Sequence, residues 1–225
     1  TLMKNSFFLL LLLFSNLVWS QEVKTSKDFK IVHATPYEVI DGTKYYMTFD
    51  DVVVSLKFTR KGFHIQKFEG DKVALKSRKD YPALPNGASV SAVIPFNGKA
   101  LVIYELYDKS NTSEQVFAFD IDPITMKVGK TIKLLSTKKK VRGSTAMTGF
   151  YKFQKLNKFH VSTNFDNNIL MINYSLVPEI KKDKNSKEIV GFHVFDETLK
   201  KVWSQELQMP EFENRLDVSQ SCIDK

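Results

Sequence analysis

Cysteine is almost absent from this sequence: Cys222 is the single one among 225 residues. A single thiol cannot form an internal disulfide, so either packing alone holds the fold or the partner of Cys222 lies outside this chain. We expect Cys222 to be buried as a small apolar side chain. The sequence also lacks the phosphate-binding P-loop, the Gly-x-Gly-x-x-Gly motif and the Gly-x-Ser-x-Gly nucleophile motif. Nucleophilic catalysis therefore has no support in the sequence.

Clusters of histidine or carboxylate side chains are scarce as well. Asp50 and Asp51 are chain neighbours, so in a strand they would point to opposite faces and could not act on one substrate. Asp120 and Asp122 fall at a strand end, where capping a turn is the simpler role. The histidines show no His-x-His or His-x₃-His spacing, and we expect them at the surface or at loop rims. They are His33, His64, His160 and His193.

One short stretch is similar to a calcium-binding loop. Asn164, Asp166 and Asn168 alternate as the first ligands of such a loop do, but Ile169 stands where glycine is needed and Ser175 where glutamate is needed. An ordinary turn between two strands is the simpler interpretation, because Asn and Asp favour turns. The sequence therefore predicts no metal, no cofactor and no catalytic residue.

The N-terminal region predicts export. Residues 1–20 have the three-part pattern of a secretory signal peptide, with Lys4 before the apolar run Phe7–Phe14 and a cleavage site between Ser20 and Gln21. A membrane-spanning helix requires about 20 apolar residues, and this apolar run is shorter. The alternative is a membrane anchor that is retained in the mature protein. We expect a periplasmic or extracellular protein without a stable membrane span after cleavage.

The rest of the sequence predicts an all-β protein. Phenylalanine and tyrosine are abundant, with 18 and 8 residues, and aromatic residues favour strands. No segment after Gln21 has a convincing helical period, whereas apolar residues alternate with polar ones in Val52–Phe58, and Asn97-Gly98 predicts a two-residue hairpin turn. The predicted strands are Lys30–Thr35, Tyr37–Ile40, Lys44–Phe49, Val52–Phe58, Phe63–Phe68, Lys72–Lys76, Ser89–Phe96, Ala100–Tyr107, Gln115–Ile121, Lys130–Leu135, Gly149–Leu156, Lys158–Thr163, Ile169–Leu176, Glu188–Asp196 and Lys201–Leu207.

Two parts of the sequence repeat one phrase. In the first, Phe119-Asp120 is followed by Thr125-Met126-Lys127; in the second, Phe195-Asp196 is followed by Thr198-Leu199-Lys200, with Trp203 in the next strand. We interpret the phrase as the outer hairpin of a four-stranded sheet, occurring once per sheet. A weaker third copy has Phe68 and Glu69 at the place of Phe-Asp.

These repeats resemble the blades of a β-propeller of the broad WD40, kelch and YVTN class. The resemblance covers about residues 52–207, although the Gly-His and Trp-Asp pairs of WD40 and the Gly-Gly pair of kelch are missing. It implies a lead-in at 21–50 and blades at 51–225. Propellers have 4 to 8 blades of about 40 to 50 residues, so we expect an N-terminal fragment, incomplete at its C-terminus. The alternative is a β-sandwich of two sheets.

The sequence is basic, with a formal net charge of +8, and two runs concentrate the charge. Lys138–Lys140 with Arg142, and Lys181–Lys187, lie in polar loops without aromatic residues that could stack on bases. We therefore expect solvated loops and no nucleic-acid partner; contact with an anionic glycan or membrane surface is the alternative.

Two functions suit an exported propeller. The first is a non-catalytic binding or scaffold module for a protein, peptide or glycan, in which Tyr107 and Trp203 are contact candidates although core packing is their expected role. The second is the N-terminal part of an exported propeller-fold hydrolase, with catalytic acids spread over several blades.

Overall fold

The structure is a computed structural model, which describes residues 42–70, 73–143, 145–147, 153–155, 157–177, 187–212 and 223. The chain divides into two units, Thr1–Ala34 and Thr35–Lys225, of which the first lies wholly outside the described residues. The signal peptide with Ser20 and Gln21, the strands predicted before residue 41, and Cys222 also lie outside them and stay predictions. No helix in the described ranges is long and apolar enough to cross a membrane.

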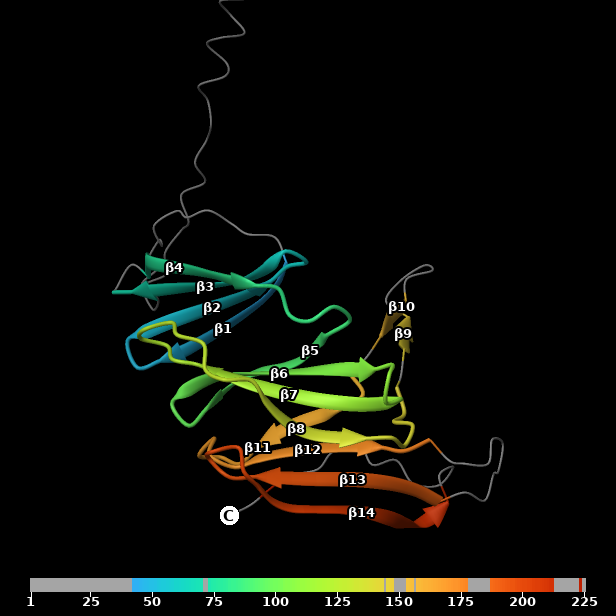
Figure 1. Ribbon diagram of the computed structural model, residues 1–225. Helices are drawn as coiled ribbons and strands as arrows, with labels where there is room; N and C mark the ends of the chain where they lie inside the picture. The colour runs from blue at the N-terminus through green and yellow to red at the C-terminus, as the bar shows by residue number, and fades with distance from the viewer. Residues whose placement is uncertain are drawn as a thin grey trace, which may run out of the picture. The chain divides into compact units, whose positions relative to one another are not determined.

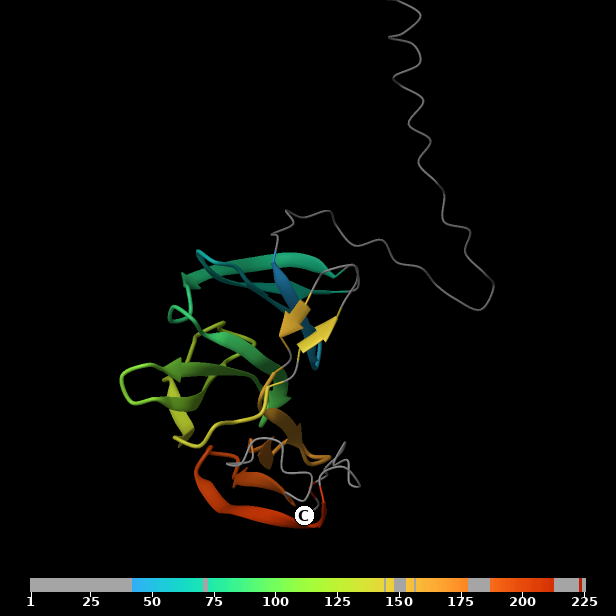
Figure 2. The same cartoon turned by 90° about the vertical axis from the view of Figure 1, so that its right-hand side faces the viewer.

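The described residues form three four-stranded antiparallel sheets, each with its strands in chain order (Figure 1). The first sheet contains β1 (Thr43–Phe49), β2 (Val52–Phe58), β3 (Gly62–Glu69) and β4 (Ala74–Pro82). The second contains β5 (Ser89–Phe96), β6 (Lys99–Asp108), β7 (Ser113–Ile121) and β8 (Ile132–Thr137). The third contains β11 (His160–Thr163), β12 (Leu170–Ser175), β13 (Lys187–Phe195) and β14 (Lys201–Phe212). A separate hairpin of β9 (Thr145–Met147) and β10 (Phe153–Lys155) lies between the second and third sheets in the chain (Figure 2).

This architecture confirms the predicted fold class and most of the predicted strands. Asn97 and Gly98 have φ values of 45° and 70°, as the predicted hairpin turn between β5 and β6 requires. Strand β4 continues to Pro82, well beyond the predicted end at Lys76, because it pairs along the whole of β3. The strand predicted at Gly149–Leu156 is described only as the short β10, and β9 was not predicted, because three residues give no readable alternation.

The hydrophobic core lies on both faces of the second sheet. In β6, Ala100, Val102 and Tyr104 belong to the core shared with the first sheet, whereas Leu101 and Ile103 belong to the core shared with the third. All five are at most 4% exposed. The unbroken apolar run in β6 therefore reflects a strand covered on both faces, and each fully buried aliphatic side chain contributes about 1.5–3 kcal/mol.

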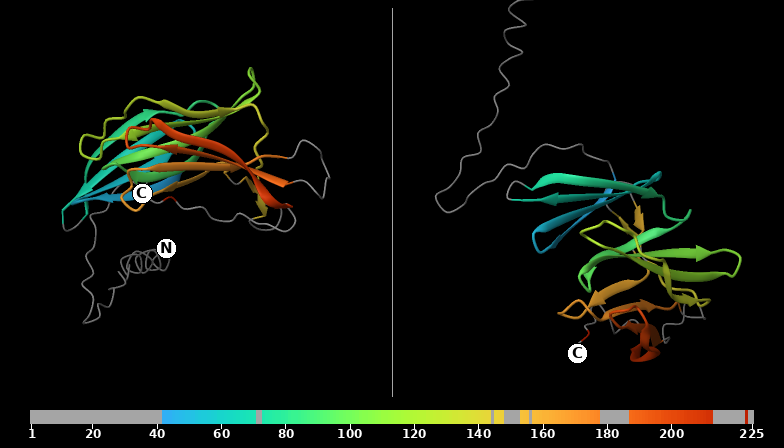
Figure 3. Two further views of the ribbon diagram at one scale, coloured as in Figure 1. Left: turned by 90° about the horizontal axis from the view of Figure 1, so that it is seen from below. Right: turned by 60° about the vertical axis from the view of Figure 1, so that its left-hand side comes forward.

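The sheets follow one another as the blades of a propeller do. Strand β5 is in contact with both β1 and β11, so the first strands of the three sheets are neighbours. The chain passes from the last strand of the first sheet, β4, directly into the first strand of the second, β5 (Figure 3). Successive four-stranded antiparallel sheets with adjacent first strands are propeller blades. A two-sheet sandwich does not account for the third sheet. The first blade includes β1, which precedes residue 51.

Candidate functional site

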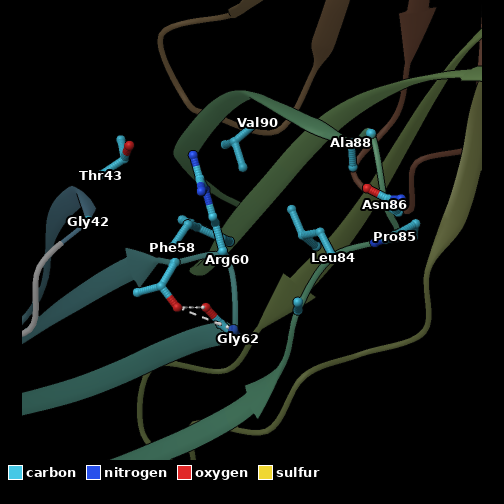
Figure 4. A pocket seen from close by; sticks show the side chains of 13 residues that line it. Gly42, Thr43, Phe58, Arg60, Gly62, Leu84, Pro85, Asn86, Ala88 and Val90 are labelled. Carbon is cyan, nitrogen blue, oxygen red and sulfur yellow. Dashed lines mark hydrogen bonds between the residues drawn. The ribbon is translucent and has the colours of Figure 1, made fainter.

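A cavity of about 890 Å³ lies at one end of the first sheet (Figure 4). Because strands alternate in direction, the β2–β3 turn and the β4–β5 loop emerge at the same end as the start of β1. All three segments contribute to the wall. The lining residues are Gly42, Thr43, Phe58, Thr59, Arg60, Gly62, Ala83, Leu84, Pro85, Asn86, Gly87, Ala88 and Val90.

The β2–β3 turn holds Arg60 at the edge of this cavity. Thr59 closes the turn: its N–H and its Oγ1 both donate to the Gly62 carbonyl, at 2.9 and 2.8 Å. The same Oγ1 accepts from the N–H groups of Lys61 and Gly62, at 3.2 Å each. A Cβ on Gly62 would lie 2.4 Å from the Tyr81 carbonyl oxygen, so the close approach of β3 and β4 requires glycine here. The conformation of the turn is thus fixed by the hydrogen bonds of Thr59 and by the close packing at Gly62.

The cavity is apolar beneath Arg60. Phe58 belongs to an aromatic row: its ring is stacked on Phe63 at 5.5 Å between centroids, and Phe63 is stacked on Tyr81 at 5.1 Å. Leu84 and Ala88 from the β4–β5 loop pack against the same hydrophobic core. The aromatic row and the β4–β5 loop therefore form an apolar wall that is packed against the hydrophobic core.

Arg60 is the one charged side chain among the described lining residues, and these include no aspartate or glutamate. Arg60 is exposed, and within the described part of the chain no hydrogen bond or ion pair engages its guanidinium. In Figure 4 the side chain runs from the turn in the direction of Val90. The site therefore combines one unpaired positive charge with an apolar wall.

A second cavity, of about 400 Å³, is lined by residues of both the second and the third sheet. Lys99 forms an ion pair there with Asp120. Asn97 ties the two sheets together beside it, because its N–H donates to the Asn167 carbonyl at 2.8 Å and its Nδ2 donates to the Glu197 carbonyl at 3.3 Å. Charges of both signs line this cavity and neutralise each other locally.

The repeated phrase occupies the predicted outer hairpins. Phe119 and Phe195 lie in β7 and β13, the third strands of their sheets, and are 4% and 1% exposed. Asp196 caps the β13–β14 turn, where its Oδ1 accepts from the N–H and the Oγ1 of Thr198 at 2.9 and 2.7 Å. Asp120 makes no such cap.

Asp122 is the structural counterpart of Asp196. Its Oδ1 accepts from the N–H and Oγ1 of Thr125, at 2.6 and 2.9 Å. Phe68 and Glu69 likewise end β3, the third strand of the first sheet. The hairpin is therefore repeated in structure, although the two copies of the phrase are offset by two residues.

The predicted aromatic contacts are more exposed than expected. Trp203 and Tyr107 are 44% and 47% exposed, so the expectation of core packing was wrong for both. Trp203 lies in β14, the last strand of its sheet, and the centroid of its ring is 6.4 Å from the centroid of the Phe192 ring. A strand with one neighbour leaves its side chains partly uncovered, and the sequence alone does not show which strand that is.

The histidines divide between the two faces of their sheets. His64 lies on the face away from the core, and its Nδ1 is 2.8 Å from Asp80 Oδ1. His193 instead packs against Tyr174, with ring centroids 5.7 Å apart. His193 is half-buried and its Nδ1 is buried, so its expected surface position was wrong, and this burial lowers the pKa of His193. His160 is exposed at the start of β11, and His33 lies outside the described residues.

The loop similar to a calcium site is a turn between β11 and β12. Asn164 Oδ1 accepts from the N–H groups of Asn168 and Ile169, at 3.0 and 2.9 Å. Its Nδ2 donates to Asn168 Oδ1 at 2.8 Å. These bonds engage the side-chain oxygens of Asn164 and Asn168, two of the three candidate ligands. No group of three or more metal-binding side chains occurs in the ranges that the structure describes.

One residue of the first basic run, Lys139, contacts the third sheet. Lys139 pairs with Glu206 of β14, and Lys138 and Lys140 are exposed. Of the second run, Lys181–Lys187, only Lys187 is described, as the start of β13.

Comparison with known proteins gives structural neighbours and no family. No protein-family model matches the chain, and no curated protein sequence matches it significantly. An endo-arabinase from Bacteroides thetaiotaomicron is similar over 76% of this chain and 61% of its own, with 10% identity and a TM-score of 0.41. An acylaminoacyl peptidase from Pyrococcus horikoshii is similar over 74% of this chain and 26% of its own, with 17% identity and a TM-score of 0.36.

The β-propeller domain of the Trilobed protease from Pyrococcus furiosus is similar over 74% of this chain and 43% of its own, with 16% identity and a TM-score of 0.34. The chain thus spans less than two thirds of the length of each of these structures. Such low TM-scores carry no conclusion about activity. The assignment of blades follows from the strand order and sheet contacts described above.

Proposed function

We propose that this chain is the binding part of an exported propeller protein and that a protein, peptide or glycan ligand occupies the cavity beside Arg60. The observation that carries the proposal is the cavity itself, about 890 Å³ in volume and walled by a locked turn and a loop packed on the core. Ligand sites are commonly concave, largely preformed and mostly apolar, with volumes of about 300–1,000 Å³.

The wall supports binding without chemistry on the ligand. It offers apolar contact from Phe58 and Leu84, hydrogen-bonding groups from Thr43 and Asn86, and one positive charge from Arg60. Acid–base catalysis needs a titratable group within hydrogen-bond reach of the substrate. The described lining residues position a ligand but offer no carboxylate or imidazole that would exchange protons with it.

A binding screen with a cavity-filling variant tests this function. The full chain is applied to peptide and glycan arrays, and any ligand found is then titrated against Ala83→Trp and Lys109→Trp. Ala83 is exposed and lines the cavity, whereas Lys109 is exposed in the β6–β7 turn and lines neither cavity. We expect Ala83→Trp to abolish binding and Lys109→Trp to leave it unchanged.

Two results would contradict the proposal. Equal binding by Ala83→Trp and the unaltered chain would place the ligand elsewhere. Cleavage of an array ligand by the full chain, detected by mass spectrometry, would favour the propeller-fold hydrolase instead.

A further inference from the structure

We infer that the ligand of this cavity is a peptide with a free C-terminal carboxylate and an apolar last side chain, with the carboxylate bound by Arg60. This inference rests on the proposed function and adds the chemical class of the ligand. It follows from the charge of the cavity, from the way Arg60 is held and from the composition of the wall.

The charge of the cavity selects an anion. Arg60 is unpaired within the described residues, and the lining described for the cavity contains no acid that could neutralise it. On strands β3 and β4 of the same sheet, the carboxylates of Glu69 and Asp80 are already paired, with Lys67 and Arg78. A planar guanidinium binds a carboxylate through two parallel N–H···O bonds, which fix the direction of the ligand as well as its charge.

The turn keeps Arg60 in place before a ligand arrives. The four hydrogen bonds between Thr59 and the residues Lys61 and Gly62 fix the backbone on both sides of Arg60. A preformed site spends less free energy on ordering when it binds. Lys61, the other central residue of the turn, does not line the cavity, so the turn directs one of its two cations into the site.

The wall favours an apolar side chain over a sugar. The carbon-rich lining residues of the cavity that Arg60 enters are Phe58, Leu84, Pro85, Ala88 and Val90. An acidic sugar carries several hydroxyl groups, each of which needs a hydrogen-bond partner when buried. The Thr59 hydroxyl is already saturated by its own turn, which leaves few side-chain partners for such a ring. A peptide end buries an apolar side chain and presents a single anion.

The test uses two fluorescent tetrapeptide libraries with random apolar residues at the last two positions, one ending in a carboxylate and the other in an amide. Binding to the full chain is measured by fluorescence polarisation. We expect the carboxylate library to bind about tenfold or more tightly than the amide library, which corresponds to about 1.4 kcal/mol. In Arg60→Gln this preference should disappear. Arg60→Lys should keep part of it, because lysine supplies the charge without the bidentate geometry.

Lys61→Gln is the matched control, because it removes the same charge from the same turn without altering the cavity lining. It should retain the tenfold preference. Circular dichroism of each variant confirms that the sheets are intact.

The failures are distinguishable. Equal binding of carboxylate and amide peptides, blocked by Ala83→Trp, would overturn the carboxylate inference and leave the binding function standing. Arg60-dependent binding of oligogalacturonate in place of either peptide library would assign the site to an acidic glycan and overturn the peptide inference. Binding of none of these probes, together with empty arrays, would overturn both proposals.

Discussion

Asp122 and Asp196 occupy equivalent places after β7 and β13, and each carboxylate accepts hydrogen bonds from the backbone and hydroxyl of the threonine that follows. In each turn the next residue is in the left-handed region, with φ of 54° at Met126 and 63° at Leu199. Such a conformation is unfavourable for side chains of this size. The aspartate cap therefore holds a turn that neither Met nor Leu would adopt by local preference.

Removal of the cap should destabilise the protein. We expect Asp122→Ala to cost about 1–2 kcal/mol, because it leaves the Thr125 N–H and hydroxyl without their acceptor. Asp120→Ala is the control two residues away; it removes an ion pair with a partly exposed Lys99 and should cost less than about 1 kcal/mol. Urea unfolding of both variants checks the difference. Equal costs would show that the cap does not stabilise the turn.

Stability should fall in acid, and three carboxylates that accept hydrogen bonds in turns should contribute to the fall. Hydrogen bonds hold the pKa of Asp108, Asp122 and Asp196 below the usual value; the main donors are the Ser110 side chain, the Thr125 backbone and the Thr198 side chain. The unfolded chain therefore takes up protons first as the pH falls. Their contribution is complete above about pH 5 and is lost as the pH falls through the folded pKa values.

The measurement is the free energy of unfolding between pH 5 and pH 2. A variant with asparagine at all three positions should show a smaller decrease over this range than the unaltered chain. An identical decrease in both proteins would mean that other groups cause the acid sensitivity.

Gly191 should be intolerant of any side chain. It lies opposite Tyr174 in the β12–β13 pairing, and a Cβ at this position would be 2.4 Å from the Tyr174 ring. We expect Gly191→Ala to cost about 1–3 kcal/mol through overpacking. Tyr174→Leu should recover part of that cost in the double variant. Gly143→Ala is the control, because its Cβ would meet only the flexible Lys158 chain at 3.4 Å, and its effect should be within about 0.5 kcal/mol.

The ion pair between Lys158 and Glu114 should stabilise the contact of the second and third sheets. Their side chains are only 18% and 10% exposed. Loss of one partner from a buried pair costs about 3–5 kcal/mol, whereas an exposed pair contributes less than about 1 kcal/mol. We expect Lys158→Met to be much more destabilising than Lys139→Met, since Lys139 is 59% exposed in its pair with Glu206. The measurement is the thermal unfolding temperature of both variants. An equal or larger decrease in Lys139→Met would contradict the prediction.

Much of the fold could be predicted because its causes are local. The alternation in Val52–Phe58 places Val54 and Leu56 in the core, and both are fully buried. Asn97-Gly98 favours positive φ at both positions and turns the chain between β5 and β6. Short antiparallel hairpins need no distant information, so strand order within each sheet follows from the sequence.

The cavity could not be predicted, because its wall joins Gly42, Arg60 and the loop at residues 83–88. Each of these is an ordinary turn or loop in the sequence. Nothing in the sequence distinguishes Arg60 from Lys61, yet only Arg60 lines the cavity. Which cation faces a site depends on the packing of three segments that are distant along the chain.

His64 and His193 show which features of a strand follow from local sequence and which follow from tertiary packing. Each stands between two apolar residues in a strand, and alternation places each histidine opposite its neighbours. In β3 the neighbours Phe63 and Ile65 face the core, whereas in β13 the histidine itself packs against Tyr174. The sequence by itself determined that the faces differ, because the strand repeat is two. Only the tertiary structure decided which face is covered, because that depends on where the adjacent sheet packs.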